Sequence, residues 1–181
     1  MATKSVPSVE DILALPDDGY RHELIFGVHH VSPAPGSRHQ RIVGELFLRL
    51  RLSCPPTFMV LMAPFAWVIA DLSGTRHEVQ PDLLVIGSGF DRDRLEDEVP
   101  ALVVEVLSPG AANRARDLED KFALYQAAGL PAYWVVDPEV PSLRAWRLIE
   151  TALAPVANVQ PGEAFDADWP WAVTLAPDEL A

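Results

Sequence analysis

Apolar residues recur at helical spacing in three segments of the chain. Ser8 precedes a run of acidic and apolar residues and Pro16 follows it, a pattern typical of a short helix with a side-chain cap at its start. Residues 37–52 repeat apolar positions on one side of a helix and leave charged positions mostly on the other. Residues 117–128 predict a third helix, which Gly129 ends.

The segments between these helices predict β-strands. Residues 21–31 alternate loosely around Gly27 and predict a bent strand or a hairpin, while residues 58–69 form a long β-rich run that Pro64 interrupts. Further strands are predicted at residues 83–86, 101–107, 133–136, 143–149, 153–159 and 169–175, with a turn at residues 71–76 and a charged loop at residues 91–98.

The order of these elements indicates the class of fold. Residues 83–86 and 101–107 are almost wholly apolar, as in strands that are covered on both faces. Helices alternate with groups of strands, which predicts an α/β protein with a central mixed β-sheet flanked by helices. A chain of 181 residues that is 49% hydrophobic is large enough for one core, so we expect a single domain over residues 1–181.

Composition narrows the expected location of the protein. No apolar run approaches the roughly 20 residues that span a bilayer, and the N-terminus lacks the apolar stretch and cleavage site of a secretory signal. Cys54 is the single cysteine, so it cannot form an internal disulfide, and we expect it to be a small apolar packing residue. The sequence therefore predicts a soluble cytoplasmic protein without membrane contact.

The formal net charge of -12 counts against a general nucleic-acid binder, because phosphate recognition depends on lysine and arginine. Basic residues nevertheless gather in two segments. The first contains Arg38, Arg41, Arg49 and Arg51, and the second contains Arg114, Arg116 and Lys121. An acidic protein with such clusters can present one basic groove, and its binding is then weak and sensitive to salt.

Three charged residues interrupt segments that otherwise predict core. Asp82 begins the apolar strand at residues 83–86, and Glu105 lies inside the apolar strand at residues 101–107. Lys121 falls on the apolar stripe of its helix, at about 100° per residue. Asp117, one turn earlier, is placed to pair with it. Charges in such positions need a partner or a metal ion, so they mark a candidate site.

Each of these residues also has a structural explanation. Asp82 follows Pro81 and can accept hydrogen bonds from loop amides at the start of a strand. Glu105 can pair with a buried arginine, and Lys121 can extend its ammonium over the apolar stripe into solvent. The three together are harder to explain structurally. Two carboxylates on neighbouring strands supply oxygen ligands for Mg²⁺, and a nearby lysine stabilises negative charge or positions water, as phosphodiester cleavage requires.

Several longer motifs carry a resemblance to a known family. They are Tyr20-Arg21-His22-Glu23-Leu24-Ile25 before Gly27, Ser32-Pro33-Ala34-Pro35 before His39, Gln80-Pro81-Asp82-Leu83, Val104-Glu105-Val106-Leu107-Ser108-Pro109, Arg116-Asp117-Leu118 before Phe122-Ala123-Leu124-Tyr125, and Gly129-Leu130-Pro131-Ala132-Tyr133-Trp134-Val135-Val136-Asp137-Pro138. Together they resemble the Uma family, restriction-endonuclease-like bacterial proteins of the PD-(D/E)XK nuclease superfamily. The resemblance covers the chain from about Val9 to about Val159.

The resemblance implies roles for particular residues. Asp82 matches the aspartate of the PD pair and Glu105 matches the acidic residue of the second motif. The lysine expected two positions later is Leu107, and Lys121 matches the position that takes over its role. Glu23 matches an upstream acidic residue that is implied as a further metal ligand, directly or through water. His39 lies on the apolar side of its helix, which favours a hydrogen-bonded core histidine over a catalytic one.

The resemblance also implies an activity and its partners. It predicts a restriction-endonuclease-like fold and a Mg²⁺-dependent endonuclease acting on DNA, in which Mn²⁺ can substitute and the protein forms a homodimer. A different class of function is a catalytically inactive nuclease-like fold used for binding or assembly, which the net charge favours. A third is metal-dependent hydrolysis of another phosphate ester.

Overall fold

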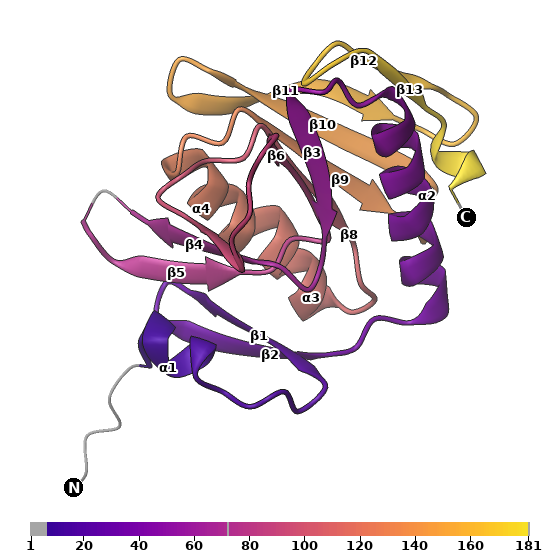
Figure 1. Cartoon of the computed structure of the whole chain (residues 1–181). Coiled ribbons are helices and arrows are strands. Elements are labelled where there is room, and N and C mark those ends of the chain that lie inside the picture. The colour runs from indigo at the N-terminus through magenta and orange to yellow at the C-terminus, as the bar shows by residue number, and fades with distance from the viewer. Residues whose placement is uncertain (1–6, 72, 181) are drawn as a thin grey trace, which may run out of the picture.

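The structure, a computed structural model, describes residues 7–71 and 73–180. Its centre is a six-stranded sheet in the order β11-β10-β9-β8-β6-β3 (Figure 1). β8 and β9 are parallel and the other neighbours are antiparallel, so the sheet is mixed, as predicted. Its strands are β3 (Phe58–Met62), β6 (Leu83–Gly87), β8 (Leu102–Val106), β9 (Ala132–Asp137), β10 (Ser142–Ile149) and β11 (Ala152–Val159).

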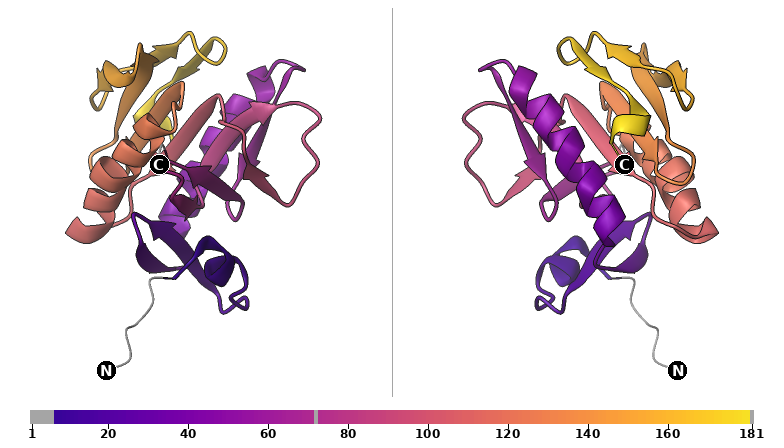
Figure 2. Two further views of the ribbon diagram at one scale, coloured as in Figure 1. Left: turned by 90° about the vertical axis from the view of Figure 1, so that its left-hand side faces the viewer. Right: turned by 90° about the vertical axis from the view of Figure 1, so that its right-hand side faces the viewer.

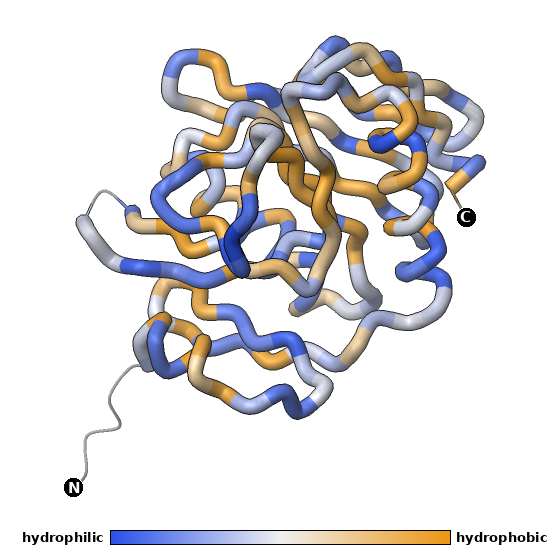
Figure 3. The backbone as a smooth tube through the Cα atoms, viewed as in Figure 1, coloured by the Kyte–Doolittle hydropathy of each residue, from blue (hydrophilic) through white to orange (hydrophobic). Residues whose placement is uncertain are grey.

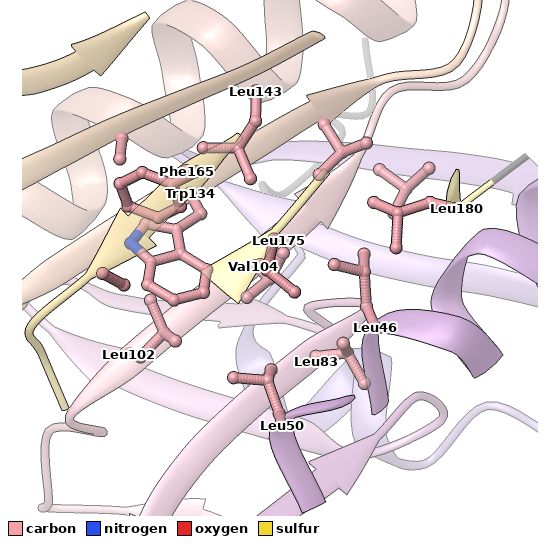
Figure 4. Packing of buried hydrophobic residues seen from close by; sticks show 14 of the residues in the cluster. Leu46, Leu50, Leu83, Leu102, Val104, Trp134, Leu143, Phe165, Leu175 and Leu180 are labelled. Carbon is pink, nitrogen blue, oxygen red and sulfur yellow. The ribbon is translucent and has the colours of Figure 1, made fainter. Parts of the chain in front are cut away.

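Helix α2 (Ser37–Ser53) and a C-terminal hairpin cover one face of this sheet. Leu46 and Leu50 of the helix are buried against Leu83 of β6, and Trp134 of β9 packs edge-on against Phe165 (Figure 4). The hairpin consists of β12 (Phe165–Ala167) and β13 (Val173–Leu175), followed by the short 3₁₀ helix η2 (Pro177–Glu179). The predicted strand at residues 169–175 is therefore shorter than expected.

The opposite face is covered by a helix and by a second sheet, so that α2 and α4 lie on opposite sides of the six-stranded sheet (Figure 2). The second sheet has the order β2-β1-β5-β4-β7. It contains β1 (Tyr20–Ile25), β2 (Val28–Pro33), β4 (Ala66–Ala70), β5 (Arg76–Val79) and β7 (Arg94–Glu96). Trp67 of β4 stacks on Tyr125 of α4, which joins the second sheet to the helix.

Two strands of the second sheet depart from the prediction. β5 begins at the last residue of the predicted turn at residues 71–76 and continues through residues with no predicted element, and β7 lies inside the predicted charged loop. Both are short and polar, and β7 pairs in parallel with the edge of β4. Their hydropathy gives no strand signal: the chain is largely hydrophilic along β5 but hydrophobic along the central strands (Figure 3).

The third predicted helix begins earlier than expected. It runs through α3 (Ala111–Ala115), the π-helical turn η1 (Arg116–Asp120) and α4 (Lys121–Ala127). In the π turn, the backbone N–H of Lys121 donates to the carbonyl of Arg116, five residues back. Such turns occur frequently at functional sites because they rotate neighbouring side chains out of α-helical register. Here Arg116, Asp117 and Lys121 all become buried.

The N-terminal prediction is confirmed. Helix α1 (Val9–Leu13) begins at Ser8, whose hydroxyl accepts from the Asp11 backbone while the Asp11 carboxylate accepts from the Ser8 backbone. Residues 1–6, on which the expectation about a secretory signal rests, lie outside the described part of the chain. In that described part, no helix is long and apolar enough to cross a membrane.

Candidate active site

Asp82 lies at the start of β6 and is almost wholly buried. Its Oδ2 accepts from the backbone N–H of Val106, at 2.9 Å, and lies 3.1 Å from Nε2 of His39. Nη2 of Arg21 donates to Oδ1 at 3.1 Å. Burial opposes ionisation, but His39 and Arg21 hold the pKa of Asp82 below its usual value. The structural explanation by loop amides is therefore partly right, because this carboxylate contacts one strand amide as well as the side chains of His39 and Arg21.

Glu105 points from β8 toward the helix and the second sheet. Nζ of Lys121 donates to its Oε1 at 2.8 Å, and the hydroxyl of Tyr125 donates to the same atom at 2.9 Å. Lys121 is fully buried, so the alternative of an ammonium extended into solvent is wrong, as is the alternative of Glu105 paired with an arginine. The inward orientation predicted from the helical stripe is confirmed.

Glu23 of β1 joins the same cluster from the second sheet. Its Oε1 lies 2.9 Å from Nζ of Lys121 and accepts from the backbone N–H of Gln80, also at 2.9 Å. Its Oε2 lies 3.8 Å from Nε of Arg116 and has no hydrogen-bond partner among the described residues. Lys121 therefore connects the upstream acidic residue with Glu105, which brings three of the predicted site residues together.

The π turn supplies two further charges. Asp117 lies 3.7 Å from Nζ of Lys121 and 3.4 Å from Nε of Arg116. The hydroxyl of Tyr133 donates to the backbone carbonyl of Asp117 at 2.8 Å, which fixes the turn against β9. The pairing of Asp117 with Lys121 that the spacing predicts is confirmed.

Two charged residues of this cluster were missed in the sequence, Arg21 and Glu78. Glu78 is fully buried on β5, where Gln80 donates to its Oε1 at 3.2 Å, and its Oε2 has no described partner. Burial raises the pKa of Glu78 to about 7. A signal was present: polar residues at every second position share one face of an extended chain. Positions 78, 80 and 82 follow this rule, as do Arg21 and Glu23.

The cluster contains more acidic than basic side chains. Five carboxyl groups, from Glu23, Glu78, Asp82, Glu105 and Asp117, interact with three permanent cations, from Arg21, Arg116 and Lys121. Burial, together with the neighbouring carboxylates, raises the pKa of Glu105 above its usual value although Lys121 opposes this. Such an excess of buried negative charge is costly and favours either a proton or an added cation.

The oxygen donors of the cluster fit only one kind of metal site. Among residues 7–71 and 73–180, no three or more histidine, cysteine, aspartate or glutamate side chains are arranged to hold a metal ion. Glu23, Asp82 and Glu105 therefore do not form a three-ligand cage. Mg²⁺ commonly binds through only one or two carboxylates and keeps several waters. The oxygen donors and the excess negative charge of the cluster fit a site of that kind.

One of the two predicted basic groups lies at the surface, along α2. Arg38, Arg41 and Arg51 are exposed on α2, whereas Arg49 pairs with Glu179. The prediction that the second group forms a basic surface is wrong. Lys121 and Arg116 are buried in the acidic cluster, and Arg114 pairs with Asp137 and Glu139.

A pocket of about 260 Å³ opens beside the first basic group. Arg38 and His39 line one side, and Ser108 and Glu139 line the other. Nε2 of His39 also lies 2.9 Å from the carbonyl of Val106. Because both neighbours of Nε2 are acceptors, this nitrogen carries a proton. The prediction of a hydrogen-bonded buried histidine is confirmed, and the partners of Nε2 are the carbonyl of Val106 and the carboxylate of Asp82.

Comparison with known proteins shows a family to which the chain is similar and a solved structure with a similar fold. The Uma2 family, described as "Putative restriction endonuclease", matches residues 9–176. A crystal structure of a putative nuclease belonging to DUF820 from Anabaena variabilis has the same fold, with a TM-score of 0.70 and 15% sequence identity over 96% of this chain and 97% of that one. No curated protein matches the chain significantly. The expected restriction-endonuclease-like α/β fold is thus confirmed.

Proposed function

Because the chain belongs to the Uma2 family of restriction-endonuclease-like proteins, we propose that it is an endonuclease that hydrolyses phosphodiester bonds in DNA with a divalent cation, Mg²⁺ or Mn²⁺. The family supports a nuclease in general. The observation that carries the specific proposal is the buried cluster in which Asp82 and Glu105, from neighbouring strands, lie with Lys121 and more acidic than basic groups.

In this proposal Asp82 and Glu105 hold the cation, and Glu23 contributes through water. A divalent cation supplies charge neutralisation at the phosphate and lowers the pKa of a water that attacks phosphorus. Lys121 holds Glu105 by a hydrogen bond and Glu23 by an ion pair, and its buried charge would help to balance the negative charge that develops at the site. The hydroxyl of Tyr125 donates to Oε1 of Glu105 and so helps to orient the carboxylate of Glu105.

The exposed arginines of α2 provide the contact with DNA. Arg38 and Arg41 lie on the first turns of the helix, next to the pocket that His39 lines. Two cations on an otherwise acidic protein give a local, salt-dependent attraction to phosphates. Cutting both strands of a duplex takes two such sites, so we propose a two-fold homodimer, which light scattering can test.

Incubation of plasmid with the purified protein, with Mg²⁺, with Mn²⁺ and with chelator, tests this function. We expect nicking that depends on the cation and that is lost in both Asp82→Ala and Glu105→Gln. Nicking that survives Asp82→Ala means that Asp82 is not part of the catalytic site.

Two observations favour a second function, an inactive nuclease-like fold used for binding or assembly. Both oxygens of Asp82 already have protein partners, and the described residues contain no three-ligand metal site. Calorimetry with Mn²⁺ separates the two functions. A nuclease binds the cation and loses that binding in Asp82→Ala, whereas a binding protein gives no heat in either form.

A further inference from the structure

Arg21 differs from the other basic residues of the cluster in its access to solvent. Lys121 is fully buried and Arg116 is held by Asp117 and Ser32, so neither ammonium nor guanidinium reaches solvent freely. The side chain of Arg21 is 17% exposed, whereas that of its partner Asp82 is 3% exposed. Arg21 is thus the basic group that connects the buried acids with the surface.

The contact of Arg21 lies on the carboxylate that the proposed function assigns to the cation. Its Nη2 donates to Oδ1 of Asp82, while Oδ2 is taken by Val106 and His39. The charge of Arg21 also interacts with Glu23 and Glu105. A guanidinium therefore lies among the three acidic residues of the proposed site, and it neutralises part of their charge.

A guanidinium in this position has a second natural partner. Its planar arrangement of donors matches carboxylate and phosphate equally well. Breaking the ion pair alone is costly, because Oδ1 of the buried Asp82 and the guanidinium of Arg21 then lose their partners. The cost disappears when Asp82 receives another cation and Arg21 receives another anion.

We propose that Arg21 is a phosphate-binding residue that rests on Asp82 in the free protein and moves to the phosphate of the nucleic acid when a divalent cation occupies the carboxylates. This inference rests on the proposed function and extends it. It makes the binding of cation and nucleic acid cooperative. The cation replaces Arg21 as the partner of Asp82, and the phosphate replaces Asp82 as the partner of Arg21.

Two binding measurements on Arg21→Gln test the proposal without any catalytic readout. The first is Mn²⁺ affinity, measured by calorimetry without nucleic acid. The second is the affinity for a short fluorescent DNA oligonucleotide, measured by anisotropy with Ca²⁺. We expect the variant to bind Mn²⁺ more tightly, by about tenfold, because the competing charge is gone, and to bind the oligonucleotide more weakly by a similar factor.

Matched variants separate this role from general effects. Arg114→Gln removes a guanidinium that pairs with Asp137 and Glu139 instead of Asp82, and it should change both affinities less than twofold. Arg21→Lys keeps the charge without the paired donors. It should retain Mn²⁺ affinity near that of the wild type but bind the oligonucleotide more weakly, and it serves if Arg21→Gln does not fold.

Opposite shifts of the two affinities support the proposal, because a purely structural arginine would weaken both. If the wild type binds Mn²⁺ and Arg21→Gln binds it equally or less well, Arg21 does not compete for Asp82, and only this inference fails. If the wild type and the folded variants all fail to bind Mn²⁺, the proposed function fails with it.

Discussion

Nζ of Lys121 on α4 lies 2.8 Å from Oε1 of Glu105 on β8, and both side chains are buried. The same ammonium contacts Glu23 from the second sheet, so one side chain neutralises carboxylates from two layers of the fold. A buried charge that loses its partner costs far more than an exposed one. This ion pair is therefore as important for the stability of the site as for its chemistry.

Replacement of Lys121 tests that importance. Lys121→Met leaves Glu105 and Glu23 without their shared cation, and we expect the free energy of unfolding at pH 8 to fall by about 3–5 kcal/mol. Denaturant unfolding followed by circular dichroism measures it. Arg51→Met removes an exposed charge from α2 and should change stability by no more than about 0.5 kcal/mol. Equal effects of the two variants would contradict the buried arrangement.

Glu78 makes stability depend on pH in a defined direction. Burial raises its pKa in the folded protein to about 7, above the ordinary value of 4.5, so the folded state holds this proton more tightly than the unfolded state. Stability from this group is therefore lost as pH rises from about 4.5 to about 7, by an amount on the order of 3 kcal/mol.

Glu78→Gln removes that titration while keeping an acceptor for Gln80. We expect the variant to be more stable than the wild type at pH 8 and to show no advantage at pH 4.5. Chemical denaturation at both pH values measures the difference. An advantage that is the same at both values would show that Glu78 does not titrate differently in the folded state.

Tyr125 contributes to the stability of the site through the hydrogen bond of its hydroxyl group. Tyr125→Phe removes the 2.9 Å hydrogen bond to Glu105 and should lower the free energy of unfolding by about 1.5–3 kcal/mol, because the acceptor carries charge. Tyr133→Phe is the matched control, since it removes a buried hydroxyl that donates to the neutral carbonyl of Asp117 and should cost about 0.5–1.5 kcal/mol. Urea unfolding at pH 9 compares them, because Glu105, whose pKa is raised to about 7, is ionised there. A larger loss in the control would contradict a charged Glu105.

The arginines of α2 determine binding to DNA in the proposed function. In the double variant Arg38→Ala and Arg41→Ala, the plot of log affinity against log salt should become shallower by about 2, since each phosphate contact contributes about 0.9. Anisotropy titrations at several salt concentrations measure this slope. Arg92→Ala with Arg94→Ala removes the same charge from arginines paired with Glu98 and Glu96 and should leave the slope unchanged. A matching decrease in both double variants would indicate nonspecific attraction.

The sequence predicts the six-stranded sheet well because its central strands are continuous apolar runs. Such a run indicates a buried strand from local sequence alone. The sequence does not predict β5 and β7, whose short polar segments become strands by pairing with neighbours, β5 with β1 and β4 and β7 with β4. Their formation depends on contacts distant along the chain, which local hydropathy does not encode.

The residues of the site also divide into those that the local sequence predicts and those that depend on distant contacts. Asp82, Glu105 and Lys121 are recognisable because each interrupts an apolar pattern. The role of Arg21 is not, because an arginine on a half-exposed strand is ordinary until the fold brings it to Asp82 from 61 residues away. The π turn is similarly invisible in the sequence, since an α-helix with the same residues satisfies the same periodicity.

The cation site itself is tested most directly by a crystal of the protein soaked in Mn²⁺ and measured for anomalous scattering. We expect a peak within bonding distance of Asp82 and Glu105, with Arg21 moved away from Oδ1 of Asp82. A soaked crystal with no peak at these carboxylates, and with Arg21 still bound to Asp82, would contradict a divalent cation at the centre of this site.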